Sequence, residues 1–442
     1  MRICVINEFF YPDSTGGTGT VLSDLARVMK DRYADVDIDV ITSTNLYRKT
    51  VDSLPKVEDW DGISIYRVPS PHPNVQSIAE RVKANIAFTF TALRKLFQLG
   101  KYDLIVIGTA PPMIAFAATF YKMKTATPFV YIVYDLEPDR SINMRVFSKT
   151  NIAVRLFRAF QQSWLNAASR IVVLGRCMRD FVSAAYSLPA DKIDFIPIGA
   201  NDYDIVPRNR QSGFRRKHEI SGFVVLYTGN FGRYHNFDTV LDAAKQLRQN
   251  NAEIKFVLVG GGIQEAHIVS RIKNEKIDNV SVYDFVSSKE YSDLLSTADV
   301  SLVTLEPGME GLCVPSKLYS ILASGRPVIG MVSPKSEVSL VIDDAKCGRQ
   351  IEQGDTSTLV EEILWMASHP EERLTMGNNA RKALVNDYGT TIIAEKYYQT
   401  FLKATARQPY IYKREDASRL FRHRTTEDDL SSTAEPLTVE IP

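Results

Sequence analysis

The chain has 442 residues, of which 45% are hydrophobic and 24% are charged. This length exceeds what a single hydrophobic core usually serves, so we expect two domains and their connections. The composition is ordinary for a globular protein. A formal net charge of +1 excludes a global attraction to nucleic acid or to an anionic membrane, so any such affinity must come from local patches.

The N-terminus does not have the pattern of a secretory signal peptide, because Asn7 and Glu8 interrupt the apolar run Arg2–Ile6. No apolar run reaches the roughly 20 residues that span a bilayer. The cysteines lack the spacing of metal ligands or of a disulfide framework; they are Cys4, Cys177, Cys313 and Cys347. These features predict a cytoplasmic location and reduced thiols.

The first half of the chain alternates short β-rich runs with helical patterns. The predicted strands are Ile3–Ile6, Ile38–Thr42, Ile63–Val68, Leu104–Ile107, Phe129–Tyr134, Ile171–Leu174 and Ile193–Ile196. The helical periods between them include Val21–Met29, Ile78–Leu99 and Val146–Ala168. This alternation predicts a parallel sheet with helices on both faces.

The same pattern starts again after a polar, proline-containing segment at residues 201–216. The predicted strands are Val224–Tyr227, Phe256–Val259, Val280–Tyr283, Val300–Leu305 and Val328–Met331. The predicted helices are Thr239–Gln249, Ile263–Lys273, Lys289–Thr297, Ser316–Ala323 and Thr356–Ala367. We therefore expect a second doubly wound α/β domain.

These patterns give a domain organisation in four parts. Residues 1–205 form the first Rossmann-like domain and residues 206–388 the second. Residues 389–407 contain a last amphipathic helix, Thr391–Ala406. Residues 408–442 lose apolar periodicity and are polar, so we expect a flexible tail.

A glycine-rich loop with Gly16, Gly17 and Thr18 connects the first strand to a helix. Glycines let the backbone approach a ligand closely, and a helix N-terminus favours an anion. The spacing differs from the Gly-x-Gly-x-x-Gly fingerprint of dinucleotide sites. The loop predicts an anion site or, as the simpler interpretation, a turn without chemical function.

Three carboxylates cluster in Tyr134–Asp139, at the end of a predicted strand. Asp135 and Glu137 are candidates to orient a sugar hydroxyl or to act as a base. The alternative is that these carboxylates cap the next helix and are solvated.

Basic and apolar residues are mixed in two helical segments, Arg81–Lys95 and Arg145–Trp164. Helices of this kind can lie on a membrane or face a lipid-linked substrate. The alternative, which is the commoner one, is a helix that packs its apolar face on the core and exposes its cationic face.

Two further loops follow predicted strands of the second half. They contain Asn230, Arg233 and His235, and Gly260 and Gly261, respectively. Arg233 could grip a phosphate in bidentate fashion. The alternatives are an exposed turn arginine and glycines that permit tight strand-to-helix packing.

The most informative segment is Glu310–Pro327, which follows the predicted strand Val300–Leu305. A loop that ends at Ser316 and is followed by a helix points the free backbone N–H groups of the first helical turn toward a single position. Such a position suits a phosphate or diphosphate. Lys317 places a cation beside that spot. Open α/β sheets bind ligands at the carboxyl ends of their strands, so the loops of the second domain predict one phosphate site.

Several of these motifs together resemble a known family. The resemblance spans residues 1–406 and rests on Gly16-Gly17, Tyr134–Asp139, Ile171–Met178, Tyr227–Gly232, Phe285-Val286, Val314–Lys317 and Ala323–Pro327. With them the chain resembles the retaining GT-B-fold glycosyltransferases of family 4, and among these the bacterial polysaccharide enzymes of the colanic-acid-biosynthesis type.

The resemblance implies a GT-B fold, in which two Rossmann-like domains face a central cleft. The second domain would hold a nucleotide-sugar donor and the first an acceptor, and the last helix would cross back to the first domain. Transfer would proceed by front-side attack, with the leaving diphosphate taking the acceptor proton and with neither a metal nor another cofactor. Positioning and charge stabilisation would then supply most of the catalysis.

The resemblance and the motifs together give three groups of site residues. The catalytic candidates are Asp135, Glu137 and Glu310. The candidates for binding the donor diphosphate are Gly16, Gly17, Thr18, Asn230, Arg233, His235, Pro315, Ser316 and Lys317. The candidates for binding the nucleoside are Gly260, Gly261, Phe285, Val286 and Ser320.

The sequence departs from the family pattern at several of these positions. Leu312 and Ser320 stand where the family has two glutamates, and Glu310 or Glu306 could replace the first. Asn230 and His235 stand where the family has a phosphate-binding arginine and lysine, and Tyr134 where it has a histidine. Arg233 and Lys317 could restore the positive charge.

The leading interpretation is a sugar transferase that extends a lipid-linked or oligosaccharide acceptor in exopolysaccharide or cell-surface glycan synthesis. It would be cytoplasmic, with possible peripheral contact with the inner face of the plasma membrane and no nucleic-acid partner. The alternatives are a GT-B-fold nucleotide-sugar 2-epimerase and a non-catalytic GT-B partner subunit. A dehydrogenase is the weakest option, because the dinucleotide fingerprint is missing.

Overall fold

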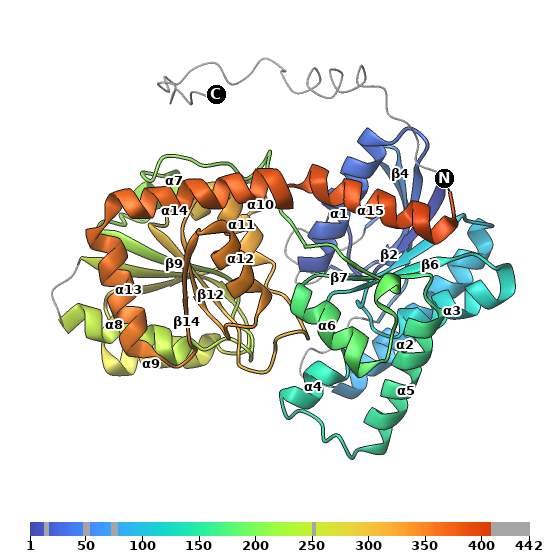
Figure 1. The fold of residues 1–442 in the computed structure, drawn as a ribbon, viewed down its shortest axis with the longest axis horizontal. Coiled ribbons are helices and arrows are strands. Elements are labelled where there is room, and N and C mark those ends of the chain that lie inside the picture. Colours follow the sequence, from blue (N-terminus) through green and yellow to red (C-terminus); the bar gives the residue numbers. More distant parts are fainter. Residues whose placement is uncertain (13–16, 47–53, 72–77, 250–252, 408–442) are drawn as a thin grey trace. The chain divides into compact units, whose positions relative to one another are not determined.

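The computed structural model describes residues 1–12, 17–46, 54–71, 78–249 and 253–407. Residues 1–407 form one compact unit, and the described part of the chain contains two β-sheets built from its successive halves (Figure 1). The predicted tail at residues 408–442 lies outside the described residues. None of the described helices is both long enough and apolar enough to cross a membrane.

Within the described residues the first sheet has eight strands in the order β3-β4-β2-β1-β5-β6-β7-β8. They are β1 (Arg2–Ile6), β2 (Asp37–Ser43), β3 (Val57–Trp60), β4 (Ile63–Val68), β5 (Leu104–Ile107), β6 (Phe129–Val133), β7 (Arg170–Val173) and β8 (Ile193–Phe195). The helices of this half are α1 (Gly17–Arg32), α2 (Ile78–Leu99), α3 (Ile114–Thr125), α4 (Asp139–Asn143), α5 (Ile152–Ala167) and α6 (Arg176–Ala185). A short 3₁₀ turn, η1 (Ala190–Lys192), precedes β8.

Most of this sheet follows the expected doubly wound pattern. Neighbouring strands are parallel except β3 and β4. Central strands such as β5 and β6 are buried along their whole length, because helices cover both faces and leave no alternation of polar residues. The order reverses at β1, which lies between β2 and β5.

The sequence pattern does not predict β3, and it misplaces one helix. The expected helix Val146–Ala168 is wrong in its first turns, because α5 begins only at Ile152. The Asn151 side chain accepts a hydrogen bond from the backbone N–H of Ala153 at 2.9 Å and so fixes the start of α5. The preceding chain forms α4 and a loop in which Arg145 has a positive φ of 56°.

Within the described residues the second sheet has six parallel strands in the order β11-β10-β9-β12-β13-β14. They are β9 (Phe223–Asn230), β10 (Ile254–Gly261), β11 (Val280–Tyr283), β12 (Val300–Thr304), β13 (Val328–Met331) and β14 (Gly348–Ile351). The helices are α7 (Gly213–Lys217), α8 (Phe237–Gln249), α9 (Glu265–Glu275), α10 (Ser288–Ser296), α11 (Lys317–Ala323), α12 (Glu337–Ala345), α13 (Thr356–Ser368) and α14 (Pro370–Ala383). The order reverses at β9, which lies between β10 and β12.

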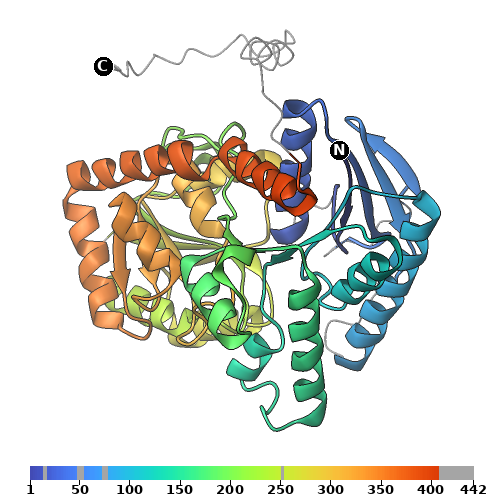
Figure 2. The same ribbon diagram turned by 45° about the vertical axis from the view of Figure 1, so that its right-hand side comes forward.

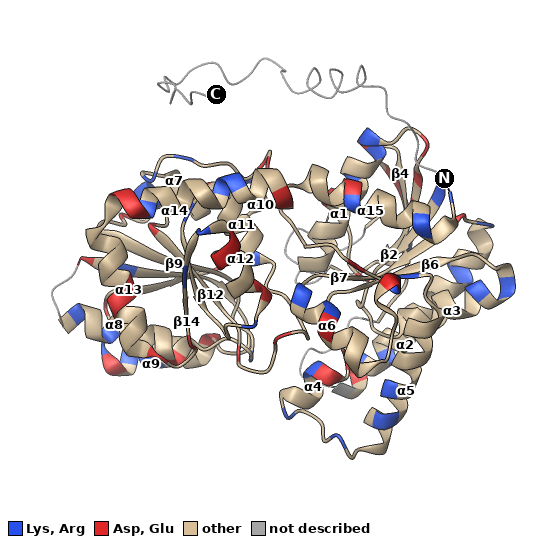
Figure 3. Ribbon diagram, in the orientation of Figure 1, with Lys and Arg blue, Asp and Glu red and all other residues tan. Residues whose placement is uncertain are grey.

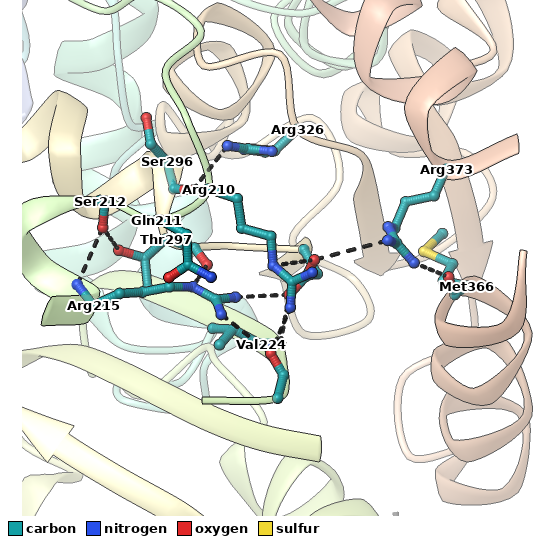
Figure 4. Close-up of polar contacts among 12 residues, drawn as sticks. Arg210, Gln211, Ser212, Arg215, Val224, Ser296, Thr297, Arg326, Met366 and Arg373 are labelled. Atoms are coloured by element: carbon teal, nitrogen blue, oxygen red, sulfur yellow. Dashed lines mark hydrogen bonds and ion pairs between the residues drawn. The ribbon is translucent and has the colours of Figure 1, made fainter. Parts of the chain in front are cut away.

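An arginine cluster at the amino-terminal edge of the second sheet attaches the segment that precedes it (Figure 4). The buried carboxylate of Asp299 accepts hydrogen bonds from Arg215 Nη2 at 2.8 Å and from the backbone N–H of Val224 at 2.9 Å. Arg210 Nε lies 3.0 Å from the same carboxylate. Arg373 approaches it at 3.9 Å from α14. One carboxylate thus joins α7, β9, β12 and α14.

The last helix, α15 (Thr390–Thr405), follows a single π-helical turn, η2 (Leu384–Tyr388), and packs on the first sheet. The rings of Tyr398 on α15 and Tyr33 after α1 stack with their centroids 3.8 Å apart. Thr400 Oγ1 donates a hydrogen bond to Asp194 of β8 at 3.0 Å. Figure 2 shows the red helix α15 lying against the dark blue helix α1.

Candidate functional site

The two sheets place their strand-end loops around the points where the strand order reverses. In the second sheet these are the loops after β9 and β12, which meet where the backbone N–H of Glu306 donates to the Tyr234 carbonyl at 2.9 Å. In the first sheet they are the loops after β1 and β5, which meet where the N–H of Glu8 donates to the Ala110 carbonyl at 2.8 Å. Such reversal points are where open α/β sheets bind ligands.

Lys317 is held by its side chain at the carboxyl end of β9. Its Nζ donates a hydrogen bond to the Tyr227 hydroxyl at 2.5 Å, and that hydroxyl donates to the Asn230 carbonyl at 2.8 Å. A Cβ built on Gly229 would lie 3.5 Å from Nζ, so the glycine leaves the amine room to approach the strand. Burial lowers the pKa of Lys317 to about 7. This amine is poised to gain a proton when an anion binds beside it.

His235 lies beside Lys317 but does not supply a second positive charge. Its Nδ1 lies 2.8 Å from the Thr304 carbonyl, which can only accept, so Nδ1 carries the proton. Burial lowers the pKa of His235 well below its ordinary value, and Lys317 lowers it further. The imidazole is therefore neutral.

Arg233 lines a pocket of about 670 Å³ between the strand-end loops of the second sheet and the end of α4. Its wall is formed by Asn143, Met144, Arg145, Val146, Arg233, Tyr234, Ile263, Gln264, Glu306, Pro307 and Met309. Arg233 itself is exposed. Burial raises the pKa of Glu306. The pocket thus brings a cation and a carboxylate together with residues from both halves of the chain.

The two carboxylates predicted after β6 are both bound by Arg140. Arg140 Nη1 lies 2.6 Å from Asp135, and Arg140 Nε donates to Glu137 at 2.9 Å. Glu137 also accepts hydrogen bonds from the Ser141 hydroxyl at 2.6 Å and from the Ser141 backbone N–H at 3.3 Å, so it binds the first turn of α4. Burial raises the pKa of Asp135, and Arg140 opposes that rise. The Asp135 side chain is 41% exposed, which leaves it free to contact a ligand.

The loop after β6 is joined directly to the loop after β12. The backbone N–H of Leu136 donates to the Leu312 carbonyl at 2.9 Å, and Asp135 and Cys313 form an antiparallel bridge. The leucine side chain at position 312 is buried. Backbone groups of Leu136 and Leu312 therefore connect the loop after β6 to the loop after β12.

The remaining diphosphate candidates lie around the start of α11. Its N-cap residue, Ser316, makes no side-chain capping hydrogen bond. A Cβ built on Gly17 would lie 3.9 Å from Ser316 Oγ, so the start of α1 lies close to the start of α11. Thr18 on α1 and Pro315 are both half-buried. Gly16 lies outside the described residues.

Glu310, the third catalytic candidate, lies in the loop before α11. Its side chain is half-buried and does not line the pocket that contains Glu306. Of Glu306 and Glu310, only Glu306 lines that pocket.

The nucleoside candidates are divided between two places. Gly260 has φ of 150°, and a Cβ there would lie 1.9 Å from the Gly229 carbonyl, so only glycine fits beside β9. The Gly261 carbonyl accepts from the Phe231 N–H at 2.9 Å. Ser320 lies on α11 and contacts the Tyr291 hydroxyl.

Phe285 and Val286 follow the edge strand β11, whereas the two glycines end β10. The Phe285 N–H donates to Asp284 at 2.7 Å, and the half-buried Val286 packs against the core. Phe285 and Val286 therefore lie two strands away from the end of β9, on the side of β10.

The structure adds residues that the sequence reasoning missed. Tyr227 orients Lys317, and Arg140 binds both carboxylates after β6. Glu8 is buried at the carboxyl end of β1, and among the described residues its carboxylate has neither an ion-pair nor a hydrogen-bond partner. A charged residue two positions after a central buried strand is the signal that could have identified it.

The arrangement of these side chains does not decide whether the reaction uses a metal ion. Among the described residues, His, Cys, Asp and Glu do not form a group of three or more that could hold a metal ion. The expectation that transfer needs neither a metal nor another cofactor stays a prediction.

Comparison with protein families assigns both halves of the chain. Residues 16–199 match the family described as glycosyl transferase 4-like domain, and residues 211–383 match glycosyl transferases group 1. The chain is 26% identical over 333 residues to "Probable glycosyltransferase WbjE" of Pseudomonas aeruginosa, which covers 74% of this chain and 81% of that protein. It is 23% identical over 274 residues to WcaI of Escherichia coli K12, which is named for colanic acid biosynthesis, and that match covers 59% of this chain and 66% of WcaI.

Solved structures share the fold at low sequence identity. Sucrose-phosphate synthase of Thermosynechococcus elongatus superposes with a TM-score of 0.73 at 17% identity, covering 92% of this chain and 99% of that one. HepE of Anabaena, solved with UDP-glucose, has a TM-score of 0.67 at 16% identity and covers 90% of this chain and 99% of its own. The predicted fold class is confirmed: the chain is a GT-B-fold glycosyltransferase that combines a glycosyl transferase 4-like domain with a glycosyl transferases group 1 domain.

Proposed function

We propose that this glycosyltransferase moves a sugar, with retention of configuration, from a nucleotide-sugar donor to a lipid-linked saccharide acceptor. The product would be an exopolysaccharide or another cell-surface glycan. The single observation that carries the proposal is the position of Lys317 over Gly229, at the point where the second sheet reverses its strand order.

Lys317 would bind the donor diphosphate. A partly desolvated amine that is fixed by a tyrosine hydroxyl makes a stronger contact with an anion than a solvated lysine does. Arg233 would supply a second cation from the neighbouring pocket wall. The UDP-glucose complex of HepE, which shares the fold, supports a donor of this class.

The acceptor would lie on the side of the first sheet, beside Asp135. Its half-exposed carboxylate can accept a hydrogen bond from a sugar hydroxyl while Arg140 holds its position. The names of WbjE and WcaI, and the colanic acid pathway in the name of WcaI, support an acceptor in bacterial polysaccharide synthesis. We further propose that this acceptor is attached to a lipid.

Retention would follow from front-side attack within this site. The bond between the sugar and the diphosphate would break while the acceptor hydroxyl attacks from the same face, and a diphosphate oxygen would take the hydroxyl proton. Lys317 and Arg233 would stabilise the negative charge that develops on the leaving diphosphate. Catalysis would then depend on cations and positioning and would not need a general base from the protein.

The donor proposal is tested by screening nucleotide sugars for thermal stabilisation, since a ligand that binds the folded state raises its apparent stability. We expect at least one UDP- or GDP-sugar to raise the melting temperature of the wild type and not that of Lys317→Ala. A wild type that responds to no nucleotide sugar would favour a non-catalytic partner subunit.

The reaction type is tested with the stabilising donor in labelled form. We expect the label to appear on an added saccharide acceptor, with the donor's anomeric configuration when the product is examined by NMR. Epimerised sugar formed without an acceptor would identify an epimerase, and an inverted product would refute retention.

A further inference from the structure

The pocket at the end of α4 is lined by three charged side chains that are not paired with each other. Arg145 and Arg233 are exposed, and Glu306 is half-buried. Within the described residues none of these three side chains makes an ion pair or a hydrogen bond. The other lining residues are uncharged, so two guanidinium groups stand against one carboxylate and the lining has an excess of positive charge.

The two arginines come from different halves of the chain. Arg145 follows α4 in the first half, and Arg233 follows β9 in the second. Figure 3 shows blue segments and no red ones in the loop between α4 and α5, which contains Arg145. Guanidinium groups bind carboxylates and phosphates in bidentate fashion. Two such groups without a counter-charge on one cavity indicate a negatively charged ligand.

The same pocket offers oxygen atoms that accept hydrogen bonds. Asn143 Nδ2 donates to the Gly308 carbonyl at 2.6 Å, and Gln264 Nε2 donates to the His235 carbonyl at 2.8 Å. A carbonyl can only accept, so these contacts fix the orientation of both amides. The amide oxygens of Asn143 and Gln264 accept no hydrogen bond within the described residues. Together with the Glu306 carboxylate they can receive hydrogen bonds from several hydroxyl groups of one ligand.

The size and the apolar part of the lining suit a saccharide. The volume of about 670 Å³ lies within the range of about 300–1,000 Å³ that is usual for small-molecule sites. Met309 and the half-buried Tyr234 add apolar surface that the C–H groups of a sugar ring can contact. A ligand that matches cations, hydroxyl acceptors and an apolar wall together is an acidic saccharide.

Helix α4 connects this pocket to the proposed acceptor side. Arg140 in its first turn lies 2.6 Å from Asp135, and its last residue, Asn143, lines the pocket. A five-residue helix is about 7.5 Å long, so a ligand of oligosaccharide size can contact both places. Lys317, the proposed contact of the donor diphosphate, does not line the pocket.

We propose that this pocket binds an acidic acceptor, which is a saccharide that carries a carboxylate or a phosphate. Arg145 and Arg233 bind the anionic group, and Glu306 accepts hydrogen bonds from sugar hydroxyl groups. The class of ligand follows from the lining of the pocket, and its role as acceptor rests on the proposed function. Arg233 is also the proposed second contact of the donor diphosphate, so Arg145 is the residue on which the proposal is tested.

The binding test uses three probes that share one sugar ring: methyl glucuronide, glucose 6-phosphate and the neutral methyl glucoside. The full chain is titrated with each, and binding is followed by ligand-observed NMR. We expect at least one charged probe to bind about tenfold or more tightly than the neutral one, which is the factor that a hydrogen bond between charged groups supplies. A preference for the glucuronide identifies a carboxylate as the acidic group, and a preference for glucose 6-phosphate identifies a phosphate.

Three variants locate the binding. Arg145→Gln should lose the preference for the charged probe. Lys149→Gln is the matched control, because Lys149 is exposed four positions further on and lines a different pocket beside α5; it should keep the preference. Lys317→Ala should also bind the charged probe as the wild type does, which separates this pocket from the donor site.

Competition measures the role of the ligand. In a transfer assay with the donor that stabilises the wild type, the preferred charged probe should compete with the saccharide acceptor and not with the donor. If no nucleotide sugar stabilises the wild type, the proposed function fails, while the Arg145-dependent preference still tests the pocket by itself.

Several results would overturn the proposal. One is a neutral probe that binds as tightly as both charged ones, and another is no binding of either charged probe up to its solubility. Equal losses in Arg145→Gln and Lys149→Gln would show that the pocket does not hold the acidic group. Competition with the donor would place the probe in the donor site. Displacement of glucose 6-phosphate by an equal concentration of inorganic phosphate would show that the sugar is not recognised.

Discussion

Each of the two strand-order reversals has one ionisable side chain whose pKa is shifted from its ordinary value by burial. Burial lowers the pKa of Lys317 to about 7 at the end of β9 and raises the pKa of Glu8 to about 7 at the end of β1. Perturbed groups in such places are candidates for ligand contacts. Lys317 was predicted from its position after Ser316. Glu8 was not, because its burial depends on β2 and β5 packing on either side of β1.

Glu8 predicts a pH dependence of stability. The folded carboxyl has a pKa of about 7 against 4.5 for an ordinary glutamate, so the folded state binds more protons between these values. Stability is therefore lost as the pH rises through this window. Glu8→Gln should match the wild type near pH 4 and exceed it above pH 7 by up to about 3 kcal/mol.

Urea unfolding at both pH values measures this difference. Glu361→Gln, which changes an exposed glutamate on α13, is the control and should show little pH-dependent gain. Equal unfolding midpoints for Glu8→Gln and the wild type at pH 8 would contradict the burial argument.

At the scale of elements, strong periodicity predicted most of the fold. The bounds of α2 agree with the predicted Ile78–Leu99, and every predicted strand has a counterpart. The missed strand β3 has the sequence Val-Glu-Asp-Trp, which is not apolar. The hairpin of β3 and β4 could nevertheless have been predicted, because the Asp61-Gly62 dipeptide is a strong turn signal. In the structure both residues have positive φ, as such a turn requires. The edge strand β14 was missed because only Ile351 of its residues is buried.

The arginine cluster around Asp299 shows an interaction that periodicity does not reveal. Asp299 compensates Arg215, whose side chain is only 2% exposed. Asp299→Asn should destabilise the chain by about 3–5 kcal/mol, because it leaves a buried guanidinium without its counter-charge. Chemical denaturation measures the loss.

Asp278→Asn is the matched control for that substitution. Asp278 pairs with Arg248 but is 67% exposed, and an exposed pair contributes about 1 kcal/mol or less. If Asp299→Asn cost no more than Asp278→Asn, the cluster would not have the structural role assigned to it.

At the scale of the molecule, contacts between the two sheets assemble the site. Arg176 at the start of α6 donates its backbone N–H to Glu337 of α12 at 2.6 Å, and its guanidinium pairs with the same carboxylate at 3.0 Å. The Leu136–Leu312 hydrogen bond makes a second connection. Sequence motifs identified the segments that contain Arg176, Leu136 and Leu312, but they did not identify α12 with Glu337, and partners so far apart in the chain could not be paired without coordinates.

Glu337 predicts how strongly this connection holds. Its side chain is 1% exposed, so Glu337→Ala should cost about 3 kcal/mol, because Arg176 loses its buried counter-charge and keeps only the exposed Asp344. Hydrogen exchange in the first turn of α6 should increase. Asp344→Ala, which removes the exposed partner of the same arginine, should have a smaller effect, and an equal effect would show that Glu337 does not fasten the two sheets.

The most direct test of the central claim is calorimetric titration of the wild type, Lys317→Ala and Lys382→Ala with UDP and with GDP. The account predicts that the wild type and Lys382→Ala bind one of these nucleotides with the same affinity. Binding by Lys317→Ala should be roughly 10- to 100-fold weaker, since a hydrogen bond to a charged group is worth about 1.5–3 kcal/mol. Unchanged affinity in Lys317→Ala, or no binding of either nucleotide by the wild type, would contradict the account.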